Sequence, residues 1–270
     1  MRVISMGQVS MGQVGRIAVG MAFLISMLSA SPPARAETED AAAVLKAMTD
    51  YVKAQKNISV VADTDIEVVT YALQKIQFTS SVELLLERPD KLRASRRGGY
   101  ADVDLIFDGK SFTLLGKHRN VYAQVESQGS VDQLLGRLRK DYGVEAPGAD
   151  LLLTDAFEVL MANVTDAKYV GQGVVGGVDC DHLAFRTDET DWQIWIQRGP
   201  KPIPRKYVIT SKAITAAPQY TLVIRDWQTE KPIAAGAFSF VAPEGAKKLE
   251  VGDLSELDEV PAGVVEGEKK

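Results

Sequence analysis

Strict alternation of apolar and polar side chains recurs along most of this 270-residue chain and limits its fold more than any other feature. In the clearest stretch one face carries five residues: Phe78, Ser80, Val82, Leu84 and Leu86. The opposite face carries polar side chains: Gln77, Thr79, Ser81, Glu83 and Glu87. Side chains of a β-strand point alternately to the two faces of a sheet, so this period of two predicts strands with one buried face.

Turn signals divide the alternating stretches into short consecutive strands. Pro89 and Asp90 favour a turn, and Asp108-Gly109 is typical of a hairpin because its central residues need positive φ. A meander of roughly six strands is expected within residues 60–125. Later candidates lie at 168–175, 178–186, 192–197, 206–210, 219–227 and 237–241. Together they indicate about eleven strands in a largely antiparallel sheet.

Three helices are expected beside the strands. Residues 40–56 have the spacing of an amphipathic helix. Ser130 and Gln133 match a capping box at the start of a second helix. Asp150 can cap a third, over 151–162, which is apolar nearly all round and must therefore be covered on most sides.

The N-terminus has the form of a secretory signal peptide over residues 1–36. Arg2 and Arg16 precede an apolar run at 17–30, and Ala34 and Ala36 complete a small-x-small exit. The run is short for a spanning helix, so we expect export to the periplasm and no stable membrane span after cleavage, an uncleaved anchor being the alternative. No linker divides the rest: a single domain is expected over 37–251, followed by an acidic flexible tail over 252–270.

Composition excludes several classes of function. The formal net charge of −5 argues against binding to nucleic acid. One cysteine and two histidines exclude a disulfide framework and a multi-thiolate zinc site, so neither a metal nor a cofactor is expected.

Cys180 and His182 are the densest pair of reactive side chains. They fall on one face of a predicted strand, with Asp179 and Asp181 on the other. Ordinary strand packing and a hydrolase using Cys180 and His182 are both compatible with this pattern. Because no third group that would orient such a pair can be identified, we expect no enzymatic activity.

Two further patterns each leave two interpretations open. The group Arg93, Arg96 and Arg97 is either a polar strand face or a contact for an acidic partner or lipid headgroup. Trp192 and Ile194 share a strand face, which is either simple core or the lining of an apolar groove partly filled by the helix at 151–162.

Taken in order, these features resemble the LolA/LolB lipoprotein-carrier superfamily and, within it, a family of predicted periplasmic proteins. The matching pieces are the signal peptide, the N-terminal helix, the meander with its turns at 88–92 and 107–109, two mid-chain helices, and the segments 177–185, 192–195, 204–207 and 238–243. The resemblance spans residues 38–251. It implies a curved antiparallel half-barrel whose concave face is closed by helices over an apolar cavity, and in the characterised relatives that cavity takes acyl chains of lipoproteins.

The resemblance therefore predicts a soluble periplasmic protein that binds an acyl chain, lipid or lipoprotein without catalysis. The alternative is an envelope interaction or stress-sensor module that acts through a protein partner. Eleven residues are the expected cavity lining: Phe78, Val82, Leu84, Leu86, Leu105, Phe107, Leu153, Phe157, Leu160, Trp192 and Ile194.

Overall fold

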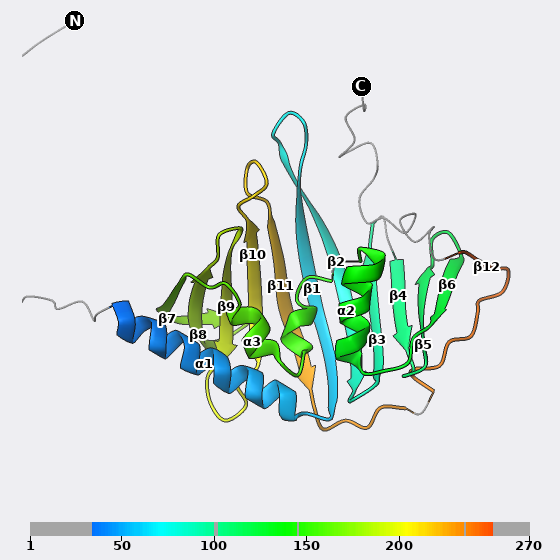
Figure 1. Ribbon diagram of the computed structural model, residues 1–270, viewed down its shortest axis with the longest axis horizontal. Coiled ribbons are helices and arrows are strands. Elements are labelled where there is room, and N and C mark those ends of the chain that lie inside the picture. Colours follow the sequence, from blue (N-terminus) through cyan, green and yellow to red (C-terminus); the bar gives the residue numbers. More distant parts are fainter. Residues whose placement is uncertain (1–33, 100–101, 145, 235, 251–270) are drawn as a thin grey trace, which may run out of the picture. The chain divides into compact units, whose positions relative to one another are not determined.

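The computed structural model describes residues 34–99, 102–144, 146–234 and 236–250 (Figure 1). All but the last three residues of the predicted signal peptide, 1–36, lie outside this part of the chain, as does the whole predicted tail, 252–270. The fold described below is that of these ranges.

A curved, open sheet of twelve strands forms the body of the described residues. Its strands are β1 (Asn57–Val69), β2 (Lys75–Glu87), β3 (Lys91–Gly98), β4 (Asp102–Phe107), β5 (Ser111–Gly116), β6 (Val121–Glu126), β7 (Asp166–Val175), β8 (Val178–Arg186), β9 (Thr190–Gln197), β10 (Pro204–Ser211), β11 (Gln219–Gln228) and β12 (Lys247–Lys248). The order is β12-β6-β5-β4-β3-β2-β1-β11-β10-β9-β8-β7. The expected mainly β, antiparallel fold is confirmed, with only the short β12 pairing in parallel.

Two meanders meet at the centre of this sheet. Strands β1 to β6 form the first, which runs from the centre to one edge, and β7 to β11 form the second, which runs from the other edge to the centre. They are joined because β1 pairs with β11 as well as with β2, so that Thr64 lies opposite both Leu222 and Ser80. The middle of the sheet is thus built from segments about 160 residues apart in sequence (222 − 64 = 158).

All helices of the described ranges lie on one face of the sheet (Figure 1). They are α1 (Ala34–Ala54), α2 (Val131–Tyr142), α3 (Ala156–Met161) and the short 3₁₀ helix η1 (Ala149–Leu152). The expected capping box of α2 is confirmed: the Gln133 N–H donates to the Ser130 hydroxyl, and the Ser130 N–H donates to the Gln133 side chain. Gly143 ends α2 in the left-handed conformation.

The expected continuous helix over 151–162 is wrong. Leu153 is extended between η1 and α3, with φ −65° and ψ 151°. Two contacts take over groups that a helix would pair internally: Arg88 Nη2 donates to the Leu152 carbonyl at 2.6 Å, and the Thr154 N–H donates to Asp132 at 3.3 Å. The Thr154 hydroxyl also bonds that carboxylate. Side chains from elsewhere in the fold therefore break the helix.

The expected strand over 237–241 is also wrong. Residues 236–238 form a turn, and Arg93 Nη1 donates to the Ala237 carbonyl at 3.2 Å. Phe238 is buried there without joining the sheet. The last strand is instead β12, where Lys247 lies opposite Val121 of β6.

The core lies between the sheet and its helices. One stripe of α1 is almost fully buried: Ala41, Leu45, Met48 and Val52. Its spacing is that of an amphipathic helix with one face on the sheet. Burying a Leu or Met side chain contributes about 1.5–3 kcal/mol, so this stripe fixes α1 over the second meander (Figure 1).

Candidate functional site

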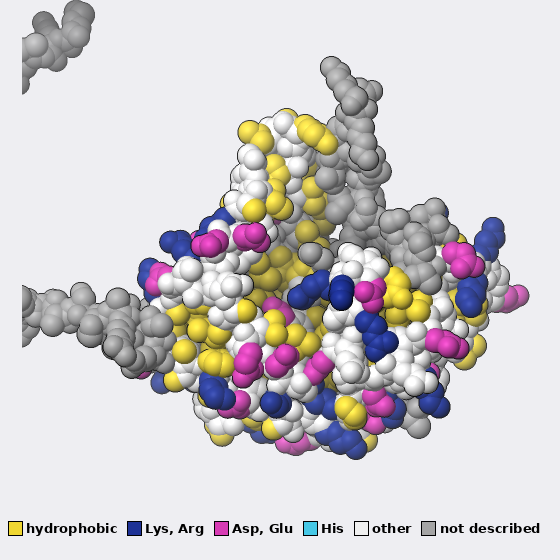
Figure 2. Space-filling model, in the orientation of Figure 1, with side chains coloured by type: hydrophobic (Ala, Val, Ile, Leu, Met, Phe, Trp, Pro, Cys, Tyr) yellow, Lys and Arg dark blue, Asp and Glu magenta, His cyan; other side chains and the backbone are white. Residues whose placement is uncertain are grey.

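A cavity of about 190 Å³ lies between the sheet and the segment that joins α2 to η1. Its floor consists of alternate residues from five strands: Val60, Ala62, Thr64, Ile66, Val82, Leu84, Leu92, Ala94, Arg96, Leu105, Tyr220, Leu222, Ile224 and Trp227. Its cover is Leu135 of α2, residues 146–148, and Ala149, Leu151 and Leu152 of η1. Figure 2 shows an apolar hollow at this place, beside α2 and extending toward the β1–β2 hairpin.

Small residues leave this space open. Ala62 and Ala94 stand where neighbouring strands carry Leu or Val, and Gly148 stands in the cover. Gly148 has a φ of +86°, and a Cβ built there would lie 3.2 Å from Leu222 Cδ2. A side chain at Gly148 would therefore be strained and would press into the cavity wall.

The pairing register arranges the floor in rows. Leu92 lies at the bottom of the floor, and the first full row above it is apolar: Trp227, Val60, Leu84, Ala94 and Leu105. The next row contains Ile224, Ala62, Val82 and Arg96. Above it lie Leu222 and Thr64, and then Tyr220 and Ile66. Polar side chains therefore enter the floor only from the second row upward, apart from the indole N–H of Trp227.

A β-bulge turns Trp227 toward the cavity. Tyr220, Leu222 and Ile224 alternate normally, but the register shifts between Val61 and Ala62 of β1, which leaves one extra residue in β11. An extra residue reverses the faces of the strand beyond it. Trp227 therefore joins the cavity wall although its position in the alternation predicts the opposite face.

Two titratable side chains in the cavity have perturbed pKa values. Burial lowers the pKa of the Arg96 guanidinium to about 10, against a smaller opposing effect of Tyr220. Burial raises the pKa of the Tyr220 hydroxyl, and the charge of Arg96 partly offsets this. At neutral pH Arg96 is charged and Tyr220 is protonated, so both present hydrogen-bond donors.

Three of the eleven expected lining residues, Val82, Leu84 and Leu105, line this cavity. Five are buried in the packed core: Leu86, Phe107, Leu160, Trp192 and Ile194. The other three are partly exposed. Leu153 borders a smaller cavity of about 20 Å³, and Phe157 packs against the core under Lys46 Nζ. Phe78 lies on β2 opposite Ile66, a residue of the floor, and does not itself line the cavity.

In the second meander, aromatic side chains pack against one another. Trp192 stacks on Phe185 with ring centroids 3.9 Å apart and meets the edge of Tyr207 at 5.8 Å. The open space lies instead over β1, β2, β3 and β11. Sequence reasoning named Arg96, with Arg93 and Arg97, as a polar strand face or a contact for an acidic partner or lipid headgroup, but it did not place Arg96 in the lining, and it missed Tyr220 and the cover at 146–149. The alternation of Leu92, Ala94 and Arg96 could have assigned Arg96 to the apolar face.

Cys180 and His182 lie away from the cavity. Cys180 is buried, and burial raises the pKa of its thiol, which is the reverse of what activates a cysteine nucleophile. His182 stacks on Trp195 at 4.0 Å, and its Nε2 lies 2.9 Å from Gln193 Oε1. Among the described residues no three Cys, His, Asp or Glu side chains are grouped as metal ligands.

The geometry is thus an apolar cavity between the sheet and a cover made of α2, residues 146–148 and η1. The chain belongs to the family described as predicted periplasmic protein (DUF2092), whose model matches residues 41–252. The expected membership of a family of predicted periplasmic proteins is thereby confirmed. No helix within the described ranges combines the length and apolar character needed to span a bilayer.

Solved structures with a related arrangement have low sequence identity. An uncharacterized conserved protein from Thermus thermophilus is 9% identical, with 78% of this chain and 98% of that chain covered and a TM-score of 0.47. Lipoprotein LppX of Mycobacterium tuberculosis is 12% identical, with 73% and 98% covered and a TM-score of 0.44. The MucA/MucB complex of Pseudomonas aeruginosa is 13% identical, with 75% of this chain and 62% of that chain covered and a TM-score of 0.43. No curated protein matches the chain.

Proposed function

We propose that this protein is a non-enzymatic periplasmic binding protein that holds a single acyl chain in the cavity over β1, β2, β3 and β11. The observation that carries the proposal is the cavity itself, about 190 Å³ with almost entirely apolar walls. Removing apolar surface from water contributes about 0.8 kcal/mol per CH₂ group. An acyl chain gains free energy from each CH₂ group that it buries against such a wall.

The size of the cavity favours one chain over two. Ligand pockets for larger molecules measure about 300–1,000 Å³, whereas a dry apolar cavity of about 150 Å³ already takes benzene. The floor runs from Val60 to Ile66 along β1, which is about 20 Å at ~3.3 Å per residue. This elongated space fits one extended hydrocarbon chain.

We further propose that the exported form begins after residue 36, that 37–251 is its single domain and that 252–270 is a flexible acidic tail. The small-x-small exit of the predicted signal peptide and the family description support this assignment. N-terminal sequencing of protein from the periplasmic fraction would test it. A mature chain that retains residues 17–30 would contradict it.

Binding of a neutral apolar fluorophore, 1-aminoanthracene, tests the cavity directly. We expect micromolar binding by the wild type and at least a tenfold loss in Ala94→Leu, because the added side chain occupies the cavity. Ala54→Leu is the matched control, since Ala54 is an exposed residue at the end of α1. Acyl lipids in extracts of the purified protein would support the proposal. No binding by the wild type, together with lipid-free extracts, would overturn it.

A second function, recognition of a protein partner, is favoured by the tip of the β1–β2 hairpin. Tyr71 and Leu73 there are 72% and 61% exposed. Exposed apolar side chains grouped in this way mark interaction sites. A photo-crosslinker at position 71, with one at exposed Lys53 as control, would test this in cells. Capture of one protein at 71 and its loss in Leu73→Ser would support the partner function.

A further inference from the structure

A second cavity, of about 170 Å³, lies at the lower edge of the sheet, where the end of α1, the β9–β10 connection and the end of β11 meet (Figure 1). Among the described residues that line it, only Ile203 has a wholly aliphatic side chain. A cavity of about 150 Å³ already takes benzene, so this polar pocket has room for a small organic molecule. The residues of its lining that matter below are Tyr51, Gln197, Lys201, Arg205, Trp227 and Glu230.

Contacts within the chain hold the walls of the polar pocket. The Gln197 N–H donates to the Ile203 carbonyl at 2.9 Å, which closes the β9–β10 connection into a loop. Two prolines within this loop fix their own φ angles. Lys201 Nζ lies 2.8 Å from Glu230 Oε1, so the loop is also tied to the segment that follows β11. The side chains of the lining therefore stand on a braced frame.

Arg205 lines the polar pocket with one edge of its guanidinium already bound. Its Nε and Nη2 donate to Gln197 Oε1 at 2.9 and 2.6 Å. This acceptor is a neutral amide oxygen, which orients the guanidinium but does not compensate its charge. The end of the fork, made of Nη1 and the other N–H of Nη2, has no acceptor among the residues that the structure describes. Such a fork binds two oxygens of a carboxylate or a phosphate through parallel hydrogen bonds.

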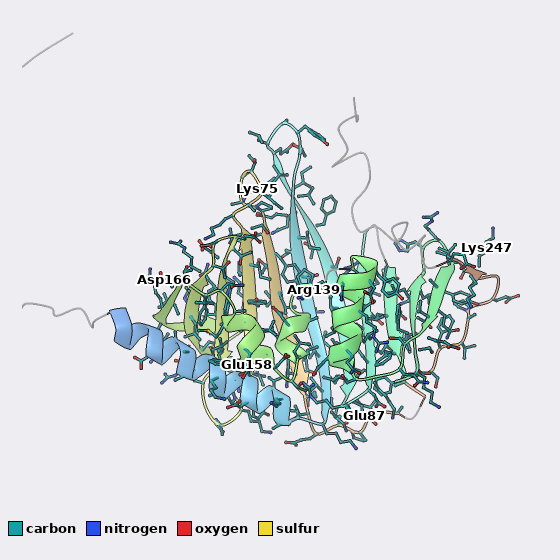
Figure 3. The ribbon with its side chains drawn as sticks, viewed as in Figure 1. Lys75, Glu87, Arg139, Glu158, Asp166 and Lys247 are labelled. Carbon is teal, nitrogen blue, oxygen red and sulfur yellow. The ribbon has the colours of Figure 1, made fainter. Side chains whose placement is uncertain are left out.

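The described lining of the polar pocket leaves the charge of Arg205 unbalanced. Glu230 is the only carboxylate in it, and Glu230 pairs with Lys201. Two carboxylates labelled in Figure 3, Glu158 on α3 and Glu87 at the lower end of β2, do not line this pocket. The lining thus carries two cations and one anion, and this excess of positive charge favours an anionic ligand.

Trp227 forms the border between the polar pocket and the apolar cavity, because it lines both. Its Nε1 is buried and has no hydrogen-bond acceptor within the described part of the chain. A buried donor without an acceptor costs free energy that a ligand oxygen can recover. This observation does not depend on the charge of Arg205, and it also indicates a ligand that carries acceptor oxygens.

We propose that the polar pocket is a second binding site, which takes a small organic molecule with a carboxylate or phosphate group. The end of the Arg205 guanidinium binds two oxygens of that group, and Lys201 and the indole N–H of Trp227 are further donors. The inference goes beyond acyl-chain binding, because Arg205 and Lys201 do not line the apolar cavity.

The test compares three probes that share a three-carbon skeleton. Glycerate, glycerol 3-phosphate and glycerol are titrated into the full mature chain at pH 7.5 by isothermal titration calorimetry. We expect at least one of the two anions to bind with a Kd of about 1 mM or less, and about tenfold or more tighter than glycerol. The tighter anion shows whether a carboxylate or a phosphate is the preferred group.

Variants in the β9–β10 region assign the preference to Arg205. Arg205→Met removes the fork at similar length, and we expect it to bind the anions no more tightly than glycerol. Arg198→Met is the matched control, since Arg198 belongs to the same connection, pairs with Asp181 at 3.4 Å and does not line the pocket. It is expected to keep the wild-type preference.

Two milder variants keep the proposal testable if Arg205→Met does not fold. Arg205→Lys keeps the charge but cannot bind two oxygens in parallel, so we expect the preference for the anions to fall by about threefold or more. Lys201→Met changes a mostly exposed side chain, and we expect it to weaken the anions and leave glycerol unchanged. Wild-type preferences in both variants would overturn the proposed site.

A tail on the anion separates two sources of the same chemistry. Dodecanoate and dodecyl phosphate carry the two anionic groups on a C12 chain. If the anion is the head of a lipid whose chain passes Trp227 into the apolar cavity, both Arg205→Met and Ala94→Leu weaken the binding of these probes. If it is a free small molecule, Arg205→Met weakens only the three-carbon anions. Either result supports the anion site.

The remaining outcomes separate this inference from the proposed function. Equal binding of the three small probes by the wild type, or no binding of any, would overturn the anion site and leave acyl-chain binding intact. A preference for the anions that Arg205→Met retains would overturn the role of Arg205. Ala94→Leu, which fills the apolar cavity, is expected to keep wild-type binding of the three-carbon anions, and failure of the wild type to bind 1-aminoanthracene would count only against the acyl-chain proposal.

Discussion

Arg96 of β3 and Tyr220 of β11 perturb each other's pKa although strands β2 and β1 lie between their strands in the sheet. Both side chains are on the floor of one cavity. This cavity and the helices lie on the same face of the sheet (Figure 1). A flat sheet would keep two such strands about 14 Å apart, at ~4.8 Å per strand.

Arg96→Met is expected to stabilise the protein in the absence of ligand. Burial lowers the pKa of Arg96 to about 10, so the folded state disfavours the charge that the variant removes. Replacing a partly buried charge by an apolar side chain of similar length should raise the free energy of unfolding by about 1 kcal/mol. Urea unfolding at pH 7.5 measures this. A variant less stable than the wild type would show that Arg96 has a structural role.

Gly148→Ala is expected to weaken acyl-chain binding as well as stability. The residue has a φ of +86°, and the new Cβ would meet Leu222 Cδ2 at 3.2 Å. The positive φ alone costs about 1 kcal/mol in a non-glycine residue. Gly143→Ala is the matched control, because Gly143 has a φ of +64° but open space at its Cβ. Both variants should lose stability in urea, and only Gly148→Ala should bind 1-aminoanthracene more weakly. Equal binding by both would contradict the placement of Gly148 in the wall.

Most strands could be predicted because their alternation is local. The pairs of Val82 and Leu84 with β3 follow from the period of two and from the turn at Pro89-Asp90, as the pairs of β4 with β5 follow from the turn at Asp108-Gly109. The meeting of β1 and β11 could not be predicted, since it joins Thr64 to Leu222 over a long sequence separation. The bulge that redirects Trp227 carries no signal in the alternation either. The cavity depends on both features, so the alternation of apolar and polar residues could not predict its location.

The prediction of a continuous helix over 151–162 was wrong for a similar reason. Its composition is strongly apolar, but Arg88 and Asp132 bind the Leu152 carbonyl and the Thr154 N–H from other parts of the chain. Tertiary hydrogen bonds of this kind override local propensity. The capping box at Ser130 was predictable because both of its partners lie within four residues.

His182 is expected to make stability depend on pH below neutrality. Burial lowers the pKa of His182, and the nearby Lys206 lowers it further, against the hydrogen bond to Gln193. The unfolded state therefore takes up a proton more readily, and stability should fall as the pH drops below about 6.5. His182→Gln should cost about 1 kcal/mol at pH 7.5 through lost stacking on Trp195. It should also show a shallower decline of the melting temperature between pH 7.5 and 5. His118→Gln is the control, and an unchanged decline in His182→Gln would contradict the prediction.

Asp104 is expected to stabilise the other face of the sheet in a pH-dependent way. Its side chain is 2% exposed and lies 2.7 Å from Lys117 Nζ and 3.0 Å from Arg93 Nη2. Burial alone would raise its pKa, but the hydrogen bonds from Lys117, Ser95 and Arg93 together lower it.

Because the folded pKa of Asp104 is lowered, its contribution is fully present above the unfolded pKa of about 3.9 and is lost as the pH falls through the folded value. Asp104→Asn should therefore reduce the free energy of unfolding by about 1–3 kcal/mol at pH 7, and by less near pH 3. Urea unfolding at the two pH values measures the difference. Glu83→Gln, at an exposed carboxylate opposite Ser95, should change stability little at either pH. An equal loss for Asp104→Asn at pH 7 and pH 3 would show that the charge of Asp104 does not stabilise the fold.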